Sequence, residues 1–586
     1  MKTLRPVNVV MVGGGWTGLA MAKEITHRTS LNVLVLERGL PRKASEYMEG
    51  MDELDYSIRL KMMQNIADET LTHRHSMKDP AMPVRQYGSF LPGSGVGGAG
   101  EHWNGMSFRF LESQFVLKTH LKEKYGSRKL PEDLAVEDWG VRYSDLEPYY
   151  WKAEQMLGIS GKAGNLRGVK QPGGNIFEGP RSHEYPLPPL KMAYAPSLFR
   201  DAAEKLGYHP FPYPAANASE AYKNPDGVSR AGCAYCGYCD RFGCMIGAKA
   251  QPSNTLMPIL SRTKSFAIRT GCWIRKVVTK GGRATGVQYV DAKGDEVFQP
   301  ADVVFLGAFT LNNVKLLLLS GIGTPYDPAT GKGTLGRNLT HQVFGVATQV
   351  YFDKPMNLFM GAGSLGVMVS DFDGDHGFDG SEPIVRGGTV WMTATGNRPI
   401  ATFGMMPTGV ASSNWGSGWK AAALAWRDRV GAMGCAGEHM AYRTNYMDLD
   451  PIYKDKMGDP LIRFTLDWTE HEHQQRLHAA QIQGKIAKAM GFPYQEAKPT
   501  KAKYNVTQYQ TTHVQGGTIM GTSPDRSVVD TNLRHWDVKN LYVMGASTFP
   551  QNASGNPTLT ALATVYKAAD TFVAAHGGSR GQKEKA

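Results

Sequence analysis

A glycine-rich turn between a strand and a helix is the feature that most limits the fold of this chain. Residues 7–12 (VNVVMV) are typical of a buried strand and lead directly into residues 13–18 (GGGWTG). A helix is predicted through residues 20–25, and a second strand over 31–36. A G-x-G-x-x-G spacing inside a βαβ unit of about 30 residues predicts a dinucleotide-binding fold.

Each glycine of this motif has its own predicted role. Gly13 allows the tight turn, Gly15 lets the backbone approach a pyrophosphate, and Gly18 lets the helix pack on the strand. Glu37 closes the second strand 19 residues after Gly18, where a carboxylate accepts hydrogen bonds from a ribose diol. The alternative is a glycine turn without a ligand, and the motif alone does not separate FAD from NAD.

The length and the order of the patterns predict several intertwined parts. The chain has 586 residues, too many for one core, and its 41% hydrophobic and 20% charged residues are ordinary for a globular protein. Residues 340–470 mix strand-like runs with Gly and Pro turns, which suits a sheet with one face covered. A strand over 541–544 and a final helix over 559–575 return to the nucleotide fold, while the small, charged tail over 577–585 is expected to fray.

Charge and hydropathy limit the possible partners. The net charge is +12 and the sequence pI is near 9.2, which fits a basic surface or a docking face for an acidic partner or an anionic membrane. No run of Lys and Arg with interleaved aromatics is present, so nucleic acid is not expected. No apolar stretch of about 18 residues predicts a membrane span. A strand that starts at Val7 leaves no room for a signal peptide, which by itself predicts a cytoplasmic protein.

Four of the six cysteines fall within twelve residues, as Cys233-x2-Cys236-x2-Cys239-x4-Cys244. Bacterial ferredoxins hold iron–sulfur clusters with nearly this spacing. Structural zinc sites have two ligand pairs separated by a dozen or more residues, and cysteines this close do not all form unstrained disulfides. The block therefore favours an iron–sulfur cluster, with zinc, disulfides or free thiols as alternatives. Cys272 and Cys435 are interpreted as buried small hydrophobic residues.

Several segments resemble signatures of the glucose–methanol–choline flavoprotein family. They run from the first glycine motif to about residue 570, and they comprise residues 307–323, 335–339 (LGRNL), 543–547 (VMGAS) and 556–560 (NPTLT). The resemblance implies FAD as the cofactor. It also implies cofactor contacts from the following residues: Val278, Gly545, Ala546, Pro557 and Thr558.

The resemblance fixes the expected fold as α/β, a discontinuous Rossmann-like FAD-binding domain with an inserted α+β substrate domain built on an antiparallel sheet. The expected parts are FAD-binding (1–120), an irregular segment with the cysteine block (121–265), FAD-binding (266–340), substrate domain (341–500), FAD-binding and catalytic (501–575) and a flexible tail (576–586).

Residues 95–104 (GVGGAGEHWN) lie where this family wraps a loop around the flavin ring. Gly97 and Gly98 would let backbone amides reach the ring, and Asn104 would contact it. His102 and Trp103 resemble a segment by which some sugar-oxidising flavoproteins bond their flavin to a histidine. A covalent link through His102 is one interpretation, and a histidine that only packs near the ring is the other.

Residues 512–521 (THVQGGTIMG) resemble the family's catalytic histidine segment, and Asn556 falls at the second position of its catalytic pair. Oxidation of an alcohol removes a proton from oxygen and a hydride from carbon. A neutral imidazole of His513 can take the proton, because its ordinary pKa lies near the working pH. Asn556 can hold the same oxygen without competing as a base.

The cysteine block resembles one branch of the family, the large flavoprotein subunits of the gluconate 2-dehydrogenase, 2-ketogluconate, fructose and sorbitol dehydrogenase type. That resemblance implies a [3Fe-4S] cluster, for which three of the four cysteines suffice. It also implies a sugar acid or polyol substrate, a multihaem cytochrome c subunit, a small subunit with a twin-arginine export signal, and a periplasmic complex that contacts the membrane only through its partners. The alternatives are a flavin oxidase that uses O₂ and binds a structural zinc, and an electron-transfer or assembly protein without alcohol chemistry.

Overall fold

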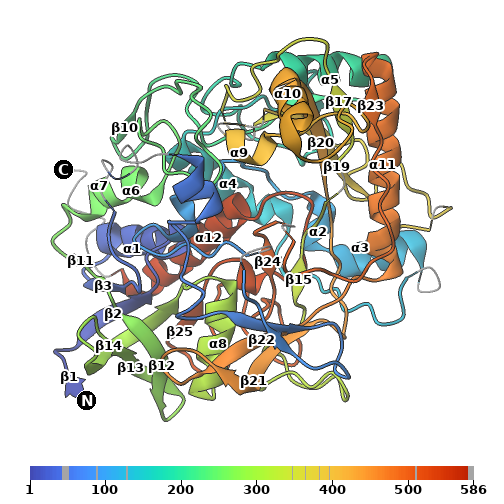
Figure 1. Cartoon of the computed structure of the whole chain (residues 1–586). Helices are drawn as coiled ribbons and strands as arrows, with labels where there is room; N and C mark the ends of the chain where they lie inside the picture. Colours follow the sequence, from blue (N-terminus) through green and yellow to red (C-terminus); the bar gives the residue numbers. More distant parts are fainter. Residues whose placement is uncertain are drawn as a thin grey trace.

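The structure is a computed structural model of the whole chain (Figure 1). It describes all residues except 43–45, 47–51, 87–89, 127–129, 346, 363–364, 382, 395, 397, 509–510 and 578–586. All but the first residue of the tail predicted to fray over 577–585 therefore lies outside the described residues.

An eight-stranded sheet carries the dinucleotide-binding fold. Its strand order is β11-β3-β2-β14-β13-β12, and β1 and β25 also pair with β14. The first four strands of that order run parallel, as a βαβ unit requires. The bounds are β1 (Lys2–Thr3), β2 (Val7–Val12), β3 (Val33–Leu36), β11 (Phe266–Arg269), β12 (Trp273–Lys280), β13 (Arg283–Val290), β14 (Glu296–Leu306) and β25 (Leu541–Val543).

Strand β14 joins two kinds of sheet because it is long. Its first half pairs with β13 in antiparallel fashion, from Gly286↔Pro300 to Val290↔Glu296. Its second half lies parallel to β2 and to β25, so that strands from the N-terminal and C-terminal parts of the chain flank it. The discontinuous nucleotide fold predicted from the sequence is thus assembled around one strand.

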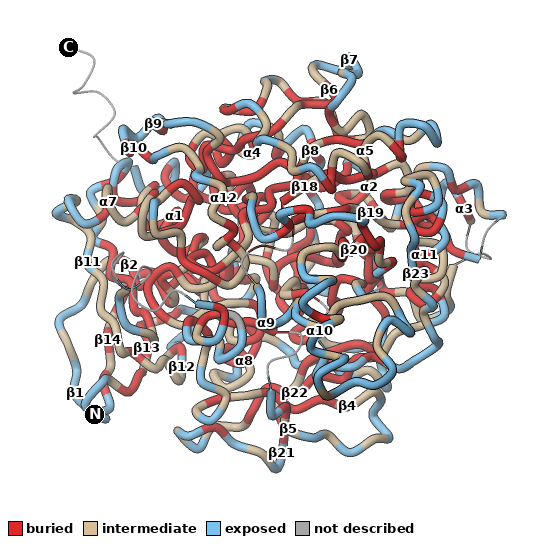
Figure 2. Tube along the Cα trace, turned by 45° about the horizontal axis from the view of Figure 1, so that its top comes forward, coloured by how far each residue is buried: buried red, intermediate tan, exposed pale blue. Residues whose placement is uncertain are grey.

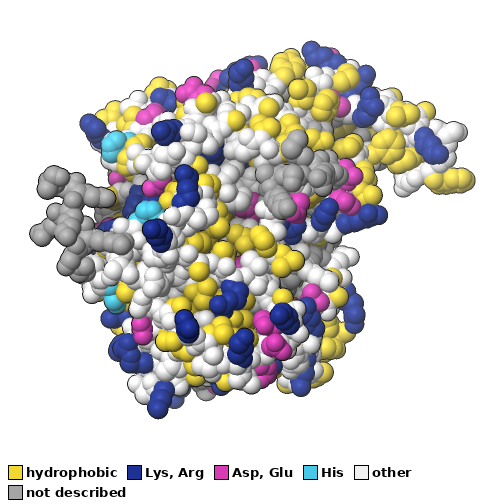
Figure 3. All heavy atoms as spheres, turned by 90° about the vertical axis from the view of Figure 1, so that its left-hand side faces the viewer, with side chains coloured by type: hydrophobic (Ala, Val, Ile, Leu, Met, Phe, Trp, Pro, Cys, Tyr) yellow, Lys and Arg dark blue, Asp and Glu magenta, His cyan; other side chains and the backbone are white. Residues whose placement is uncertain are grey.

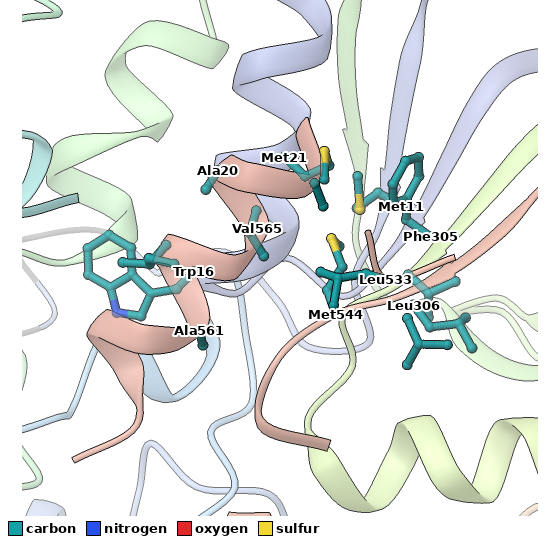
Figure 4. Close-up of a cluster of buried hydrophobic side chains, with 14 of the residues drawn as sticks. Met11, Trp16, Ala20, Met21, Phe305, Leu306, Leu533, Met544, Ala561 and Val565 are labelled. Carbon is teal, nitrogen blue, oxygen red and sulfur yellow. The ribbon is translucent and has the colours of Figure 1, made fainter. Parts of the chain in front are cut away.

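Three helices cover this sheet and form its main core. They are α1 (Trp16–Arg28), α4 (Tyr143–Leu157) and α12 (Thr558–His576), and α12 packs against both of the others. Figure 4 shows Met21 of α1 and Val565 of α12 facing Met11 and Phe305 of the sheet, and all four side chains are fully buried. Burial of such side chains stabilises the fold by about 1.5–3 kcal/mol each.

A second, seven-stranded sheet is antiparallel throughout its described pairs. Helices α5 (Tyr194–Lys205) and α11 (Glu470–Met490) pack on one face, as Figure 1 shows for α11 beside β19 and β20. This agrees with the predicted sheet with one face covered. Its strands are β8 (Phe211–Pro212), β16 (Val343–Phe344), β17 (Gln349–Tyr351), β18 (Gly366–Val369), β19 (Gly388–Thr393), β20 (Val430–Gly437) and β23 (Tyr494–Gln495).

Smaller elements connect the two sheets. Helix α8 (Thr310–Ser320) packs on β12, and a four-stranded sheet lies beside it, with the order β21-β22-β4-β5. Figure 2 shows the buried residues running continuously between the two large sheets. The bounds are β4 (Leu71–Arg74), β5 (Met82–Pro83), β21 (Tyr446–Lys454), β22 (Pro460–Thr465), β15 (Thr340–His341) and β24 (Val514–Gln515).

The segment over 121–265 divides between the two sheets. Helix α4 packs on α12 of the nucleotide fold, whereas α5 and β8 belong to the antiparallel sheet. The remaining short elements are η2 (Leu54–Ile58), η3 (Gly98–Gly100), α2 (Glu112–Phe115), α3 (Leu117–Tyr125), β6 (Asn165–Leu166), β7 (Val169–Lys170), β9 (Tyr222–Lys223), β10 (Ser229–Arg230), α6 (Pro252–Thr255), α7 (Met257–Leu260), α9 (Pro399–Thr402), α10 (Gly416–Trp426) and η5 (Ala546–Thr548).

Candidate active site

A cavity of about 480 Å³ lies between the nucleotide fold and the antiparallel sheet. Its wall includes Gly13, Gly15 and Glu37 of the βαβ unit, and also His513 and Asn556 from the C-terminal part. The other predicted contact residues on the wall are Gly97, Gly98, His102, Asn104, Gly545, Ala546, Pro557 and Thr558. The fold thus brings into one cavity nearly all the residues that the sequence assigned to cofactor and catalysis.

The glycine turn has the shape that a dinucleotide requires. Gly13 has φ +96°, and a Cβ there would lie 2.5 Å from the carbonyl oxygen of Gly307. A Cβ on Gly18 would lie 2.2 Å from the oxygen of Gly13, so Gly18 serves packing and is absent from the cavity wall. Beside Gly15 the nearest atom to a Cβ is 3.9 Å away, which leaves room at the N-terminus of α1. That helix end suits a pyrophosphate.

Glu37 faces the same cavity from the end of β3. Its two carboxylate oxygens accept the backbone N–H groups of Gly14 and Gly39, each at 2.8 Å. Burial raises the pKa of Glu37, although these N–H donors oppose the shift. The remaining lone pairs of the carboxylate can accept a ribose diol.

Val278 is absent from the cavity wall, and its contact with the cofactor stays a prediction. It pairs with Gly286 in the middle of β12, and the start of that strand contributes Trp273 and Ile274 instead. The start of β12 is held near the ribose end because the N–H of Cys272 donates to the carbonyl of Glu37 at 3.0 Å. Val278 lies about 15 Å further along the strand.

The glycine-rich loop packs directly on the dinucleotide turn. The N–H of Gly97 donates to the carbonyl of Gly14 at 2.8 Å, and Gly97 has φ +98°. His102 belongs to the cavity wall, its side chain is buried, and its Nε2 atom has no hydrogen-bond partner in the described structure. Burial lowers the pKa of His102 to about 3, so the imidazole is neutral. Asn104 Oδ1 accepts the N–H of Met106 at 3.0 Å.

His513 is positioned by a short antiparallel ladder. Strands β15 and β24 pair with His341 opposite Val514, which sets Gln342 opposite His513. His513 Nδ1 lies 2.7 Å from Gln342 Oε1, and the amide nitrogen of Gln342 donates to the carbonyls of Ala553 and Ser554. Burial lowers the pKa of His513 to about 4, so the ring is a neutral base.

Asn556 precedes α12 and lines the cavity together with Ser554. The chain before it is tied to the histidine, because Asn552 Nδ2 donates to the carbonyl of His513 at 3.3 Å and Gln342 holds the carbonyls of residues 553 and 554. Hydrogen bonds therefore connect His513 to the chain segment that immediately precedes Asn556, the other residue of the predicted pair.

The cysteine block lies behind the glycine-rich loop. The N–H of Arg241 donates to the carbonyl of His102 at 2.9 Å. Lys249 Nζ, fully buried, donates to the carbonyls of Trp103, Cys239 and Phe242 at 2.5, 2.8 and 2.8 Å. These bonds join the loop at the cofactor cavity to the loop that carries the cysteines.

The described cysteines form no disulfide, and three sulfurs of the block have N–H donors nearby. Cys233, Cys239 and Cys244 each accept one such bond at 3.4 Å, from Tyr235, Asn217 and Lys249. Burial raises the pKa of Cys239 to about 12, so a thiolate there requires a bound cation. Among the described residues, no three His, Cys, Asp or Glu side chains converge closely enough to hold a single metal ion.

Several wall residues carried no signal in the sequence. Gln342 has no motif of its own, and only the ladder register places it on His513. Tyr213 lies in the wall with a buried hydroxyl that has no partner within the described structure. Trp391, Thr393 and Arg398 come from the end of β19 and the chain after it.

The fold and this cavity define a flavin-dependent oxidoreductase that acts on an alcohol. A profile described as GMC oxidoreductase matches residues 191–344 and 441–564. A gluconate 2-dehydrogenase flavoprotein of Pantoea cypripedii is 41% identical over 575 residues, which cover 96% of this chain and 93% of the relative. The fructose dehydrogenase large subunit of Gluconobacter japonicus is 25% identical over 598 residues and 97% of each chain.

Solved structures agree on the fold. Pyridoxine 4-oxidase from Mesorbium loti superposes with a TM-score of 0.60 and 16% identity over 97% of this chain and 99% of its own. The chain belongs to the GMC oxidoreductase family and is an FAD-dependent enzyme. No helix in the described part of the chain is long and apolar enough to cross a membrane.

Proposed function

We propose that the chain oxidises an alcohol group of a sugar acid and passes the electrons through an iron–sulfur cluster at Cys233, Cys236, Cys239 and Cys244. The observation that carries this proposal is the bonding of the glycine-rich loop to the cysteine loop by Lys249 and Arg241. Because the glycine-rich loop and the cysteine loop are bonded to each other, transfer of electrons from the flavin to a cluster in the cysteine loop is favoured over their transfer to O₂.

The cavity residues supply the proton chemistry. FAD, when bound, supplies the hydride acceptor. His513 Nε2 takes the proton of the substrate hydroxyl, because Nδ1 is engaged by Gln342 and the ring is neutral. Asn556 holds the same oxygen and directs its carbon into the cavity. The unpartnered Nε2 of His102 supports a covalent bond to the flavin.

A carboxylate substrate finds a cation on the wall. Arg38 and Lys315 are bound by Glu69, and Lys315 also by Asp455. Arg398 contacts Asp240 at 3.5 Å, and its buried Nε atom has no partner in the described structure. Arg241, the fourth cation of the wall, belongs to the cysteine loop, where its backbone N–H donates to His102 and its Nε atom lies 4.0 Å from Asp240. We assign the carboxylate to Arg398, which follows β19 of the antiparallel sheet. The 41% identity to a gluconate 2-dehydrogenase flavoprotein supports the same class of substrate.

We further propose a [3Fe-4S] cluster, with three of the four cysteines as ligands, and a multihaem cytochrome c subunit as the next carrier. A small subunit with a twin-arginine signal would carry the folded chain to the periplasm, where partners provide the membrane contact. The name of the Gluconobacter japonicus relative, a large subunit, supports a complex with further subunits.

The test is an EPR spectrum of the isolated protein with iron, zinc and flavin assayed on the same sample. We expect an oxidised-state cluster signal that disappears when gluconate or 2-ketogluconate is added. A sample that lacks iron, contains zinc and forms peroxide would establish a flavin oxidase instead. Arg398→Gln should raise the KM for the acid at least tenfold and leave that for a neutral polyol unchanged.

A further inference from the structure

Large exposed hydrophobic residues gather in one stretch of the chain. Of the nineteen in the described structure, seven lie between residues 359 and 424. Trp415 is 80% exposed and Leu424 is 59% exposed. The others are Phe359, Met360, Ile400, Phe403 and Val410. Soluble proteins seldom leave such a group uncovered, and a larger apolar patch marks a contact surface.

Five of these seven residues lie within residues 399–426, the stretch that contains helices α9 and α10, and we call this stretch the apolar arm. Helix α10 has eleven residues, of which only Ala423 is buried. In Figure 1 the two helices lie toward the viewer near the top, and Figure 3 shows at its upper right a projecting part coloured mainly as hydrophobic with scattered Lys and Arg. A helix with so little buried surface gains little from packing on its own fold.

The base of the apolar arm adjoins the cysteine block. Gly361 exchanges two backbone hydrogen bonds of 2.9 Å with Tyr235 and Gly237, on either side of Cys236. This places Phe359 and Met360 next to the block. Arg398, directly before the arm, contacts Asp240 at 3.5 Å. The apolar arm therefore begins next to the loop that carries the proposed cluster.

The charge around the apolar residues is positive. Residues 399–430 contain Lys420, Arg427 and Arg429 but one acid, Asp428. The carboxylate of Asp428 accepts the backbone N–H groups of Asn357 and Leu358, at 2.5 and 2.6 Å. It is thus engaged within the fold, and a partner with acidic groups around an apolar centre would complement this surface.

We propose that the apolar arm, with Phe359 and Met360, is the docking surface for an electron-accepting protein subunit that presents an apolar centre and an acidic rim. The inference rests on the proposed function, since it takes the cysteine block as the exit for electrons. Each oxidised alcohol releases two electrons and two protons, and an oxidised haem in the partner accepts the electrons one at a time. A protein fits better than a flat bilayer, because only a shaped partner contacts both the projecting arm and the loop at its base.

The test compares Trp415→Ser and Leu424→Lys with Ile452→Lys, a matched control. Ile452 is 74% exposed and lies on β21, at the opposite end of the molecule in Figure 1. Each affinity-tagged chain is produced in the source organism and purified in mild detergent, and the haem-to-flavin ratio is read from visible absorbance. We expect a loss of at least tenfold for Leu424→Lys and a smaller loss for Trp415→Ser. The control should match the unmodified chain.

An unchanged haem content in both arm variants would overturn the docking surface, as would an unmodified complex that contains no haem. These results are independent of turnover. Flavin reduction by gluconate and 2-ketogluconate, measured with ferricyanide as acceptor, tests the proposed function separately. The two proposals can fail separately. If haem is lost from the arm variants but neither sugar acid reduces the flavin of the unmodified complex, the proposed substrate is wrong and the docking surface is still supported.

Lipid binding is tested with the purified chain and vesicles of phosphatidylglycerol and phosphatidylcholine. We expect no sedimentation that depends on Leu424. If the chain binds vesicles, and Leu424→Lys but not Ile452→Lys abolishes that binding, the arm is a membrane contact and the protein-docking proposal is wrong.

Discussion

The Nδ1 atom of His513 lies 2.7 Å from the amide oxygen of Gln342, and this contact fixes which ring nitrogen can act as the base. The amide nitrogen of Gln342 donates to two backbone carbonyls, so its oxygen must face the ring. An oxygen there requires Nδ1 to carry the proton. Nε2 is then unprotonated and open to the substrate.

The first prediction concerns this pair. His513→Ala should slow flavin reduction by substrate by about 10²-fold or more, the usual weight of a general base. Gln342→Met should slow it by about tenfold, which is the loss of one hydrogen bond of about 1.4 kcal/mol. Stopped-flow absorbance of the flavin measures both. Because Gln342 acts through His513, the double variant should be no slower than His513→Ala alone, and an additive result would contradict the assignment.

The second prediction concerns acid stability. His341 is fully buried, its two ring nitrogens lie 2.7 Å from the Tyr504 hydroxyl and 2.9 Å from the Thr511 carbonyl, and burial lowers its pKa to about 3. The unfolded chain binds the proton near pH 6.5, so stability falls as pH drops below that value. Between pH 7 and 5, protonation of this one group in the unfolded chain should lower the free energy of unfolding by about 2 kcal/mol.

Denaturant unfolding at pH 7, 6 and 5 measures this loss. His341→Gln should be less stable at pH 7 and should show a shallower dependence on pH. His27 is exposed at the end of α1, and His27→Gln is the control that should leave the slope unchanged. Equal slopes for all three proteins would show that His341 does not titrate on unfolding.

The third prediction concerns a buried ionic cluster between α4 and the following loop. Glu154 is fully buried, and its carboxylate accepts two bonds of 2.9 Å from Arg109 and one of 2.6 Å from Arg181. Glu154→Ala would leave two buried guanidiniums without this partner and should lower the free energy of unfolding by about 3–5 kcal/mol. Asp201→Ala removes an exposed ion pair with Arg200 and should change it by less than about 1 kcal/mol.

The fourth prediction concerns Lys249. Lys249→Met removes the donor to three buried carbonyls and should lower the free energy of unfolding by about 3 kcal/mol. The loop at Cys239 should loosen, so a thiol reagent should modify the cofactor-free chain faster. Lys264→Met, at an exposed lysine, is the control. Equal modification rates in the two variants would show that Lys249 does not hold the two loops together.

The sequence by itself determined the features that are local. A strand, a turn and a helix are adjacent in the chain, so the G-x-G-x-x-G spacing and the acid at Glu37 predicted the nucleotide turn that the structure contains. The bounds of α12 matched the predicted final helix over 559–575 to within one residue, because 3.6-residue periodicity is a local signal. The histidine segment and Asn556 were also recognisable as short motifs.

Only the tertiary structure decided which distant residues meet. Gln342 reaches His513 through the register of two strands that lie 171 residues apart, and no pattern in either strand records that pairing. Lys249 joins the glycine-rich loop to the cysteine loop because its ammonium is buried where three carbonyls converge. The sequence also does not tell which end of the strand that carries Val278 reaches the cavity, and the structure places Trp273 and Ile274 there. Such contacts depend on long-range packing, in which side chains far apart in sequence share one enclosed space.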